Sequence, residues 1–258
     1  MTSLELHHET ATNDNIAALC SDSNHVLLGG TPYGNKVVKL SDIAVVKFGV
    51  GVKEDEANNQ KRAYELVDHS IVRVPFVYRF FSKEGLGYIV MEHMQGRVLK
   101  PVEDPSLMDR ITYVLTHLAK IHHSIPGALG GGKSRGSFWS EGEEPSLHTV
   151  KDLEKWFNRR LLKQHHKLVF SGSELVLCHL DIAPRNFLLL QDDSLCLLDW
   201  ASTGFYPRIF EVCALRITHG REGSFPGDVL KLEDLTDEEE SHIKLMLEAY
   251  YNSMRFHL

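Results

Sequence analysis

The sequence contains no run of apolar residues that approaches the roughly 18 needed to cross a membrane as a helix. The N-terminus lacks the charged segment followed by an apolar stretch that is typical of a secretory signal. Neither internal repeats nor a collagen-like or disordered composition is present, which argues against fibrous and repetitive architectures. We therefore expect a soluble, cytoplasmic, globular protein with no membrane partner.

Cysteine is scarce, with 4 residues among 258, and no two of them have the Cys-x-x-Cys spacing of many metal and redox motifs. Three of them, Cys178, Cys196 and Cys213, lie in apolar surroundings. Disulfides persist in oxidising compartments and are rare where thiols are kept reduced. The sequence therefore predicts free, buried thiols in a reducing compartment.

Basic residues are outnumbered by acidic ones, 28 Lys and Arg against 35 Asp and Glu, which gives a formal net charge of −7. Binding to nucleic acid or to an anionic membrane depends on clustered basic residues. The charge balance therefore argues against both partners, while it permits an acidic site for a cationic substrate. A chain of 258 residues can form one or two domains.

The most informative stretch runs from Leu177 to Asp199. Three short apolar runs at 175–178, 187–190 and 195–198 are separated by a polar loop and by an Asp-Asp-Ser turn. This pattern predicts strand, loop, strand, turn and strand. The side chains of Asp181, Asn186 and Asp199 would then lie at the ends of adjacent strands. Three such oxygen side chains can converge on a hard cation such as Mg²⁺ and on a hydroxyl, as phosphoryl transfer requires.

The order His179-x-Asp181-x-x-x-x-Asn186, followed by a hydrophobic strand and Asp199, is similar to the catalytic-loop and metal-loop pair of kinase-like enzymes. With Pro-Arg before Asn186 and Leu-Asp-Trp around Asp199, the chain most resembles the aminoglycoside phosphotransferase and choline kinase family, including fungal phosphotransferase-domain proteins. The resemblance covers roughly residues 37–211. It is specific because several spaced identities coincide with the expected strands.

Two positions depart from the family's common His-Gly-Asp-Leu-His-Pro: Leu180 replaces the glycine and Ala183 replaces the second histidine. The three chemically essential positions are nevertheless present. Protein kinases carry Asp-Phe-Gly where this chain has Asp199-Trp200-Ala201. This difference favours the small-molecule branch of kinase-like enzymes.

The resemblance implies an α+β, bilobal, protein-kinase-like fold. An N-terminal antiparallel five-stranded sheet with one helix would face a mainly helical C-terminal lobe across a cleft. The implied division is a lead-in at 1–25, an N-lobe at 26–94 and a C-lobe at 95–258. The apolar patterns agree with this division. They predict strands at 26–28, 36–40, 43–48, 74–81 and 87–94, and helices at 53–67, 104–121, 152–168 and 240–256. The lead-in is either frayed or contains a short helix at 15–20.

In the N-lobe, the resemblance assigns Lys47 to the α- and β-phosphates of a nucleotide. Glu56 is the best candidate for the carboxylate that holds this lysine, although Gln60 or Lys61 occupies the position where the family usually has it. Glu56 would otherwise only favour the helix N-terminus. The main-chain groups of Glu92 and Met94 are implied to bind the adenine, and the loop at 29–35 to cover the phosphates.

In the C-lobe, the resemblance implies that Asp181 is the general base and that Asn186 and Asp199 bind Mg²⁺. His179 is interpreted as a packing residue, and Glu211 as a carboxylate that braces the backbone of the catalytic loop. Arg185 would pair with a nearby acid or with a phosphate. Two further expectations come from the residues alone: a flexible glycine-rich loop at 127–137, and a capping box that opens the last helix at Thr236.

The function expected from these residues is that of an ATP- and Mg²⁺-dependent kinase that phosphorylates a hydroxyl of a small molecule. A protein kinase is disfavoured because Ala-Pro-Glu, Asp-Phe-Gly and an activation loop of normal length are missing. A nucleotide-binding scaffold without turnover and a purely structural two-lobe protein remain alternatives. The sequence identifies neither the phosphoryl acceptor nor the oligomeric state.

Overall fold

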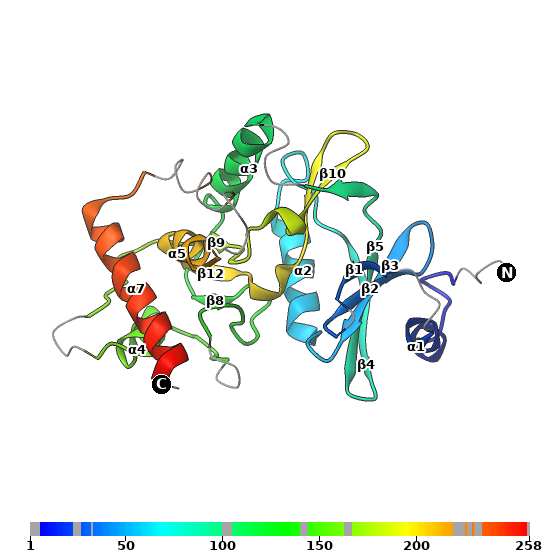
Figure 1. Cartoon of the computed structure of the whole chain (residues 1–258), viewed down its shortest axis with the longest axis horizontal. Helices are drawn as coiled ribbons and strands as arrows, with labels where there is room; N and C mark the ends of the chain where they lie inside the picture. The colour runs from blue at the N-terminus through cyan, green and yellow to red at the C-terminus, as the bar shows by residue number, and fades with distance from the viewer. Residues whose placement is uncertain are drawn as a thin grey trace.

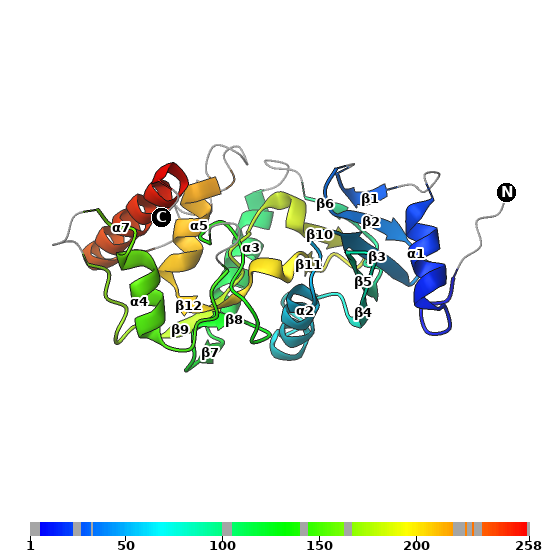
Figure 2. The same ribbon diagram turned by 90° about the horizontal axis from the view of Figure 1, so that it is seen from below.

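The structure is a computed structural model, and the residues that it describes are 6–22, 27–31, 33–99, 105–139, 144–162, 167–218, 225, 229 and 234–256. They form two lobes that lie side by side along the long axis of the molecule (Figure 1). The sheet-rich lobe carries the N-terminus and the more helical lobe carries the C-terminus (Figure 2). The predicted bilobal α+β fold is confirmed.

The small lobe contains one antiparallel sheet with the strand order β1-β2-β3-β5-β4. The five predicted strands are all present, with shifted ends. They are β1 (Leu27–Gly30), β2 (Lys36–Lys39), β3 (Ala44–Gly49), β4 (Val77–Lys83) and β5 (Leu86–Glu92). The strand expected from Val74 begins only at Val77, because the backbone before it is used elsewhere: Pro75 accepts a hydrogen bond from the Gln60 amide. Val26, where the first strand was expected to begin, lies outside the described residues.

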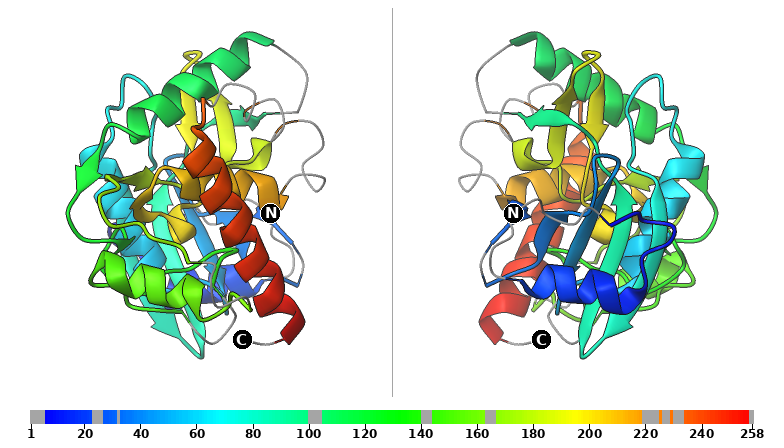
Figure 3. Two further views of the ribbon diagram at one scale, coloured as in Figure 1. Left: turned by 90° about the vertical axis from the view of Figure 1, so that its left-hand side faces the viewer. Right: turned by 90° about the vertical axis from the view of Figure 1, so that its right-hand side faces the viewer.

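Two helices cover opposite faces of this sheet, α1 (Asn13–Ser21) and α2 (Glu54–Leu66). Successive strand residues point to opposite faces, and β3 shows this alternation. Ala44, Val46 and Phe48 pack in the cluster that includes α1, whereas Val45 packs with Ala57 of α2. Figure 3 shows α1 lying across the strands on the outer side of the lobe. The sheet was expected to carry one helix, and α1 adds a second.

The large lobe contains the helices α3 (Pro105–Leu118), α4 (Val150–Asn158), α5 (Ile209–Thr218) and α7 (Asp237–Phe256). The capping box predicted at the start of α7 is present, since Thr236 and Glu239 exchange backbone-to-side-chain hydrogen bonds. Among the described residues, a buried cluster of apolar side chains from α4, α5 and α7 forms the centre of this lobe. Asp104, where α3 was expected to begin, lies outside the described residues.

Two small sheets complete the large lobe. One has the order β7 (His122–His123), β9 (Leu175–Cys178), β12 (Gly204–Pro207), β8 (Gly127–Ala128), and the other has the order β11 (Leu195–Leu197), β10 (Phe187–Leu190), β6 (Gly96–Val98). The three strands of the central stretch were expected to be adjacent, and this expectation is wrong for β9. It pairs with β7 and β12 because the loop of residues 179–186 carries the chain away from β9 before β10 begins.

The lobes are joined by backbone pairing as well as by the chain that runs between them. After β5, the chain passes into the large lobe, where β6 pairs with β10 and Leu99 donates a hydrogen bond to Phe187 O. Arg73, which follows α2, forms hydrogen bonds with Leu195 O and with the Leu197 amide of β11. The small lobe is therefore connected to the large lobe at two separate points of its chain.

The helix expected at 152–168 is shorter than predicted, since α4 ends at Asn158. The Asn158 side chain exchanges two hydrogen bonds with the backbone of Leu168, which brings the chain back toward the helix end. Arg160, which follows the end of α4, is only 1% exposed. Its guanidinium lies 3.8 Å from the centroid of the Trp156 ring and donates a hydrogen bond to Trp156 O.

We expect Arg160→Ala to lower the free energy of unfolding by about 2–4 kcal/mol, because it removes a buried guanidinium and leaves its acceptors unpaired. The neighbouring Arg159 also stacks on Trp156 but is exposed. Arg159→Ala should therefore cost less than about 1 kcal/mol. Urea unfolding of both variants measures the difference, and equal losses would contradict the structural assignment of Arg160.

The backbone turns sharply where β9 leads into the loop of residues 179–186. Leu180 adopts a φ of 64°, in the left-handed region that favours glycine. Its side chain is nevertheless 3% exposed and packs in the core of the large lobe. Leucine at this position therefore combines backbone strain with favourable burial, which explains how it can stand where glycine is common.

We expect Leu180→Gly to be more stable than Leu180→Ala by about 1 kcal/mol, because only glycine relieves the left-handed strain after the side chain is lost. Both variants should be less stable than the wild type, since each leaves a cavity. The buried Leu177 in β9 provides the control: there alanine should be more stable than glycine. Urea unfolding of the four variants tests this reversal, and its absence at Leu180 would contradict the strained backbone.

In the part of the chain that the structure describes, no helix combines the length and the apolar character needed to span a bilayer.

Candidate active site

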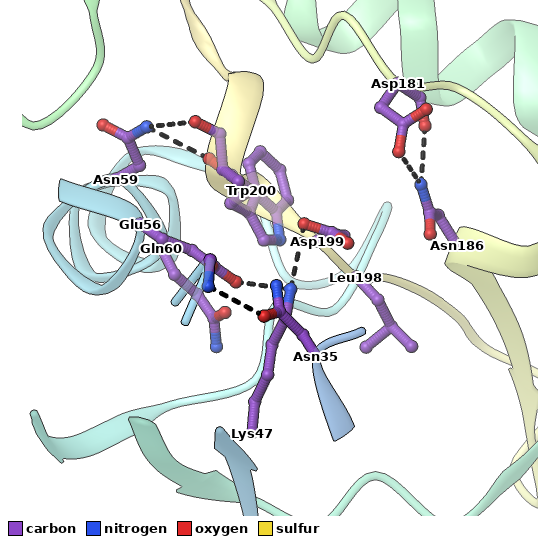
Figure 4. A network of polar contacts seen from close by, with 12 residues as sticks. Asn35, Lys47, Glu56, Asn59, Gln60, Asp181, Asn186, Leu198, Asp199 and Trp200 are labelled. Atoms are coloured by element: carbon purple, nitrogen blue, oxygen red, sulfur yellow. Dashed lines mark hydrogen bonds and ion pairs between the residues drawn. The ribbon is translucent and has the colours of Figure 1, made fainter. Parts of the chain in front are cut away.

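Lys47 reaches the junction of the lobes from the small sheet. It lies in β3 on the face that carries Val45, which is the face covered by α2. The segment 36–39 of β2 and the strand β5 pair with β3 on either side, so the lysine stands on a central strand. Its side chain is 13% exposed, and its ammonium is directed toward the large lobe (Figure 4).

Two carboxylates hold this ammonium. The Nζ atom of Lys47 lies 2.5 Å from Glu56 Oε1 and 3.1 Å from Asp199 Oδ1. The ion pair expected between Lys47 and Glu56 is thus present. Gln60, the alternative partner, instead donates to Pro75 O and to the sulfur of Met91. Lys61 is exposed on the other side of α2.

Burial and charge act in opposite directions on this cluster. Burial alone would lower the pKa of Lys47, but the carboxylates of Asp199 and Glu56 outweigh it and raise the pKa above its ordinary value. For Asp199, burial raises the pKa, and the ammonium of Lys47 outweighs it and lowers the pKa overall. Burial dominates at Glu56 and raises its pKa. Lys47 is therefore charged at neutral pH, and Asp199 is ionised.

Asp199 follows β11 and has a left-handed backbone with a φ of 63°. Aspartate tolerates this conformation better than most residues. The left-handed turn ends the strand and directs the Asp199 carboxylate toward Lys47. His179 holds the backbone just before Asp199, since its Nε2 atom lies 3.1 Å from Leu198 O. The ring is fully buried against Trp200, and burial lowers its pKa, so it acts as a neutral packing group, as the sequence predicted.

Glu211 of α5 fixes the loop of residues 179–186 from the other side. Its carboxylate accepts hydrogen bonds from the backbone amides of His179 and Leu180. A carboxylate that binds two consecutive amides stabilises the tight turn between them. The bracing role expected for Glu211 is therefore present in the structure.

Asp181 and Asn186 face each other across the loop (Figure 4). The Asn186 Nδ2 atom donates to Asp181 O over 2.7 Å and to Asp181 Oδ2 over 2.8 Å. The other carboxylate oxygen of Asp181 lies 2.6 Å from a nitrogen of Arg185. Of the two partners expected for Arg185, the structure shows the acid. Asp181 is thus held in one orientation while its side chain stays 27% exposed.

The residues on the large-lobe side fit a magnesium ion. Both amide hydrogens of Asn186 are directed at oxygen atoms of Asp181, so its Oδ1 is the atom left to accept or to coordinate. Asp199 offers a carboxylate that is 39% exposed. Mg²⁺ in nucleotide sites usually takes one or two protein oxygens and completes its shell with phosphates and water. It therefore does not need a larger cluster, and the described residues contain no group of three or more His, Cys, Asp and Glu suited to a metal.

The segment between β5 and β6 is where the adenine was expected. The backbone amide of Glu92 donates to Phe76 O over 2.8 Å, so this N–H is already used within the small lobe. The amide of His93 likewise donates to Ile43 O. An adenine interaction at Glu92 would therefore depend on its carbonyl oxygen. Met94, two residues after the end of β5, would supply its own main-chain groups.

Two glycine-rich segments differ in their packing. The hairpin between β1 and β2 closes tightly, since the Thr31 amide donates to Asn35 O and a side chain at Gly30 would clash with the same atom. The segment at 127–137 was expected to be a flexible loop, and this expectation is wrong. A Cβ atom at Gly130 would come within 2.9 Å of the backbone of α2, and Ser134 is fully buried. Gly130 and Gly132 are needed for close packing against α2.

Sequence reasoning missed Asn59 of α2. Its amide is buried, donates to Trp200 O and Ala201 O, and accepts a hydrogen bond from the Gly130 amide. The available signal was its spacing: Asn59 lies three residues after Glu56, which places both on one face of the helix. A polar residue on the buried face of a helix requires partners, and these partners come from parts of the chain that are distant in sequence.

Comparisons with known proteins place this geometry in context. Residues 23–235 match the model of a family described as the phosphotransferase enzyme family. Comparison with curated proteins gives no match. Among solved structures, the aminoglycoside phosphotransferase APH(4)-Ia has a TM-score of 0.60 at 14% identity, with 92% of this chain and 87% of that chain covered.

Two other solved structures are similar. A putative fructosamine-3-kinase from Haemophilus somnus 129PT has a TM-score of 0.55 at 10% identity, with 90% of this chain and 86% of that chain covered. A complex of APH(2")-IIIa with GDP and kanamycin has a TM-score of 0.54 at 13% identity, with 95% and 92% covered. At these identities the structures establish a shared fold. Because the family match spans most of the sequence and the fold agrees, the chain belongs to the phosphotransferase enzyme family.

Proposed function

We propose that this protein transfers the γ-phosphoryl group of ATP to a hydroxyl of a small molecule. The observation that carries the proposal is the cluster in which the Lys47 ammonium joins Glu56 of the small lobe to Asp199 of the large lobe. Asp181 and Asn186 lie on the large-lobe side of this cluster (Figure 4). A fixed cation and a set of hard oxygen ligands on opposite lobes are what phosphoryl transfer requires.

Lys47 binds the α- and β-phosphates in this proposal. Its pKa is raised, so it carries a full positive charge, and Glu56 prevents the ammonium from turning away. Glu92 O and the main-chain groups of Met94 bind the adenine edge. Two related structures were solved with AMP-PNP or with ADP, which favours ATP as the phosphoryl donor. Another was solved with GDP, which makes GTP the alternative donor.

Asn186 and Asp199 would hold Mg²⁺, which when bound neutralises charge that develops on the transferred phosphoryl group. Asp181 orients the acceptor hydroxyl and takes its proton. The hydroxyl oxygen forms a bond to the γ-phosphorus while the bond from phosphorus to the bridging oxygen breaks, and ADP leaves. Arg185 and Asn186 keep the Asp181 carboxylate in place, so little reorganisation is needed at the moment of transfer.

The acceptor is a small molecule with a free hydroxyl group. Proteins of this fold have been solved in complex with hygromycin B or with kanamycin. The acceptor of this chain is best identified by screening amino sugars, sugars and amino alcohols for acceptor-dependent consumption of ATP.

A cytoplasmic location is part of the proposal. All four cysteines are free and buried, and burial raises the pKa of each thiol. Such thiols resist oxidation and metal binding, and they suit a reducing compartment.

We expect ATP with Mg²⁺ to raise the melting temperature of the wild type by about 5 °C or more at 100 times the dissociation constant. Asp199→Asn keeps the size and the left-handed preference of the residue but removes its charge. The increase that depends on Mg²⁺ should then be lost, while the smaller effect of ATP alone remains. Thermal-shift titrations with ATP and GTP, each with Mg²⁺ or EDTA, measure both. An unchanged Mg²⁺ effect in the variant would remove Asp199 from the metal site.

For catalysis, Asp181→Asn should reduce kcat by about 10²–10⁴-fold while nucleotide affinity stays close to that of the wild type, because only proton transfer and hydroxyl orientation are lost. The measurement is acceptor-dependent ATP consumption with the substrate found by screening, beside a nucleotide titration of the same variant. Turnover equal to that of the wild type would contradict the role of Asp181. A wild type that binds ATP with Mg²⁺ but phosphorylates none of the acceptors would favour a nucleotide-binding scaffold.

A further inference from the structure

A single buried amide on α2 connects three distant segments. Asn59 is 1% exposed, and its Nδ2 atom donates to Trp200 O over 3.1 Å and to Ala201 O over 3.2 Å. Its Oδ1 atom accepts from the Gly130 amide over 2.7 Å. The side chain thus uses both hydrogens and its oxygen, and all three partners belong to the large lobe.

These hydrogen bonds lie directly beside the two carboxylates that bind Lys47. Trp200 and Ala201 are the two residues that follow Asp199, in the turn η2 (Trp200–Ser202). Glu56, which holds Lys47, lies one helical turn before Asn59 on the same face of α2. Figure 4 shows the two side chains leaving the helix toward Lys47 and toward the turn at Trp200. One helix face therefore sets the position of both carboxylates that bind Lys47.

We propose that Asn59 is a positioning residue: it fixes the turn after Asp199 against α2, so that Asp199 is kept at the distance from Glu56 and Lys47 that magnesium-dependent nucleotide binding requires. This inference rests on the proposed function. In the proposed function, Asn59 contacts neither the nucleotide nor the acceptor. It acts through the backbone that carries Asp199.

The chemistry of the site explains why an amide is needed. Two carbonyl oxygens require donors and one backbone N–H requires an acceptor, and an amide side chain satisfies all three. A carboxylate would place negative charge against the two carbonyl oxygens. An apolar side chain would leave three buried polar groups unpaired. Glycine at position 130 allows this contact. A Cβ atom there would lie 2.8 Å from Asn58 and 2.9 Å from the backbone nitrogen of Asn59, too close for any side chain.

The next residue supplies a matched control. Gln60 is also a buried amide of α2, 3% exposed, but it donates to Pro75 O and to the Met91 sulfur within the small lobe. Removing either amide leaves buried acceptors unpaired and lowers stability. Only the loss of Asn59 releases the turn that follows Asp199. The two variants therefore separate a loss of stability from a loss of positioning.

The experiment compares the wild type with Asn59→Ala, Asn59→Asp and Gln60→Ala. Mg²⁺ is titrated into each protein at saturating AMP-PNP, and thermal stability is the readout, so no turnover is needed. Asn59→Asp keeps the size of the side chain and the acceptor for Gly130, and it provides the test if the alanine variant does not fold. It is measured near pH 8, where the new carboxyl is ionised. Hydrogen exchange of the Gly130 amide is followed without ligand.

We expect both Asn59 variants to need about 10-fold more Mg²⁺ for half-maximal stabilisation, the size of effect seen when groups that orient metal ligands are removed, while Gln60→Ala stays within about twofold of the wild type. Exchange at Gly130 should become faster in Asn59→Ala but not in Gln60→Ala. If all three variants share the Mg²⁺ dependence of the wild type, the positioning role is wrong while the proposed function stands. If the wild type itself shows no response to Mg²⁺ with nucleotide, the proposed function is wrong and this inference falls with it.

Discussion

The structure depends on one interaction between its lobes, the binding of the Lys47 ammonium by Glu56 and Asp199. Each of the three side chains comes from a different element, and burial of any one charge alone would be unfavourable. Together they offset one another, which requires β3, α2 and the end of β11 to meet at a fixed place. The same requirement explains why a lysine is accepted on a central strand of the sheet. The cluster therefore specifies how the two lobes are assembled, in addition to the charge it presents to a ligand.

Much of the large-lobe side of the site could be predicted from the sequence because its residues are local. Asp181, Asn186 and Asp199 lie within a stretch whose alternation of apolar runs and polar turns is visible in a single reading. Pairing of Glu56 with Lys47 was harder to predict, since the distance along the chain also allowed Gln60. The structure shows that Glu56 is the partner. Side chains alternate between the two faces of β3, so Lys47 points toward α2, and the first turn of that helix places Glu56 opposite the ammonium. The residue roles in catalysis remain predictions.

Features that depend on distant partners could not be predicted. Asn59 looks like an ordinary helix residue until its three partners in the large lobe are known. Arg160 carries a charge that ordinarily favours solvent, yet Trp156 and the last helix cover it. The glycines at 127–137 suggested flexibility, whereas they allow the chain to approach α2 closely. In each case tertiary packing outweighed local propensity. The spacing of Asn59 from Glu56 indicated a shared helix face but did not reveal the partners of Asn59.

The backbone hydrogen bonds between Arg73 and β11 restrict how far the two lobes can move apart. Arg73 of the small lobe forms backbone hydrogen bonds with β11 of the large lobe, and the chain that leaves β5 is anchored in the large lobe where β6 pairs with β10. A wide rotation of one lobe away from the other would break the bonds at Arg73, at a cost comparable to local unfolding. On the proposed function, the nucleotide and the acceptor would therefore reach the site through small displacements of connecting loops. In such a molecule, the loops at the junction can change position while the backbone frame around Arg73 stays fixed.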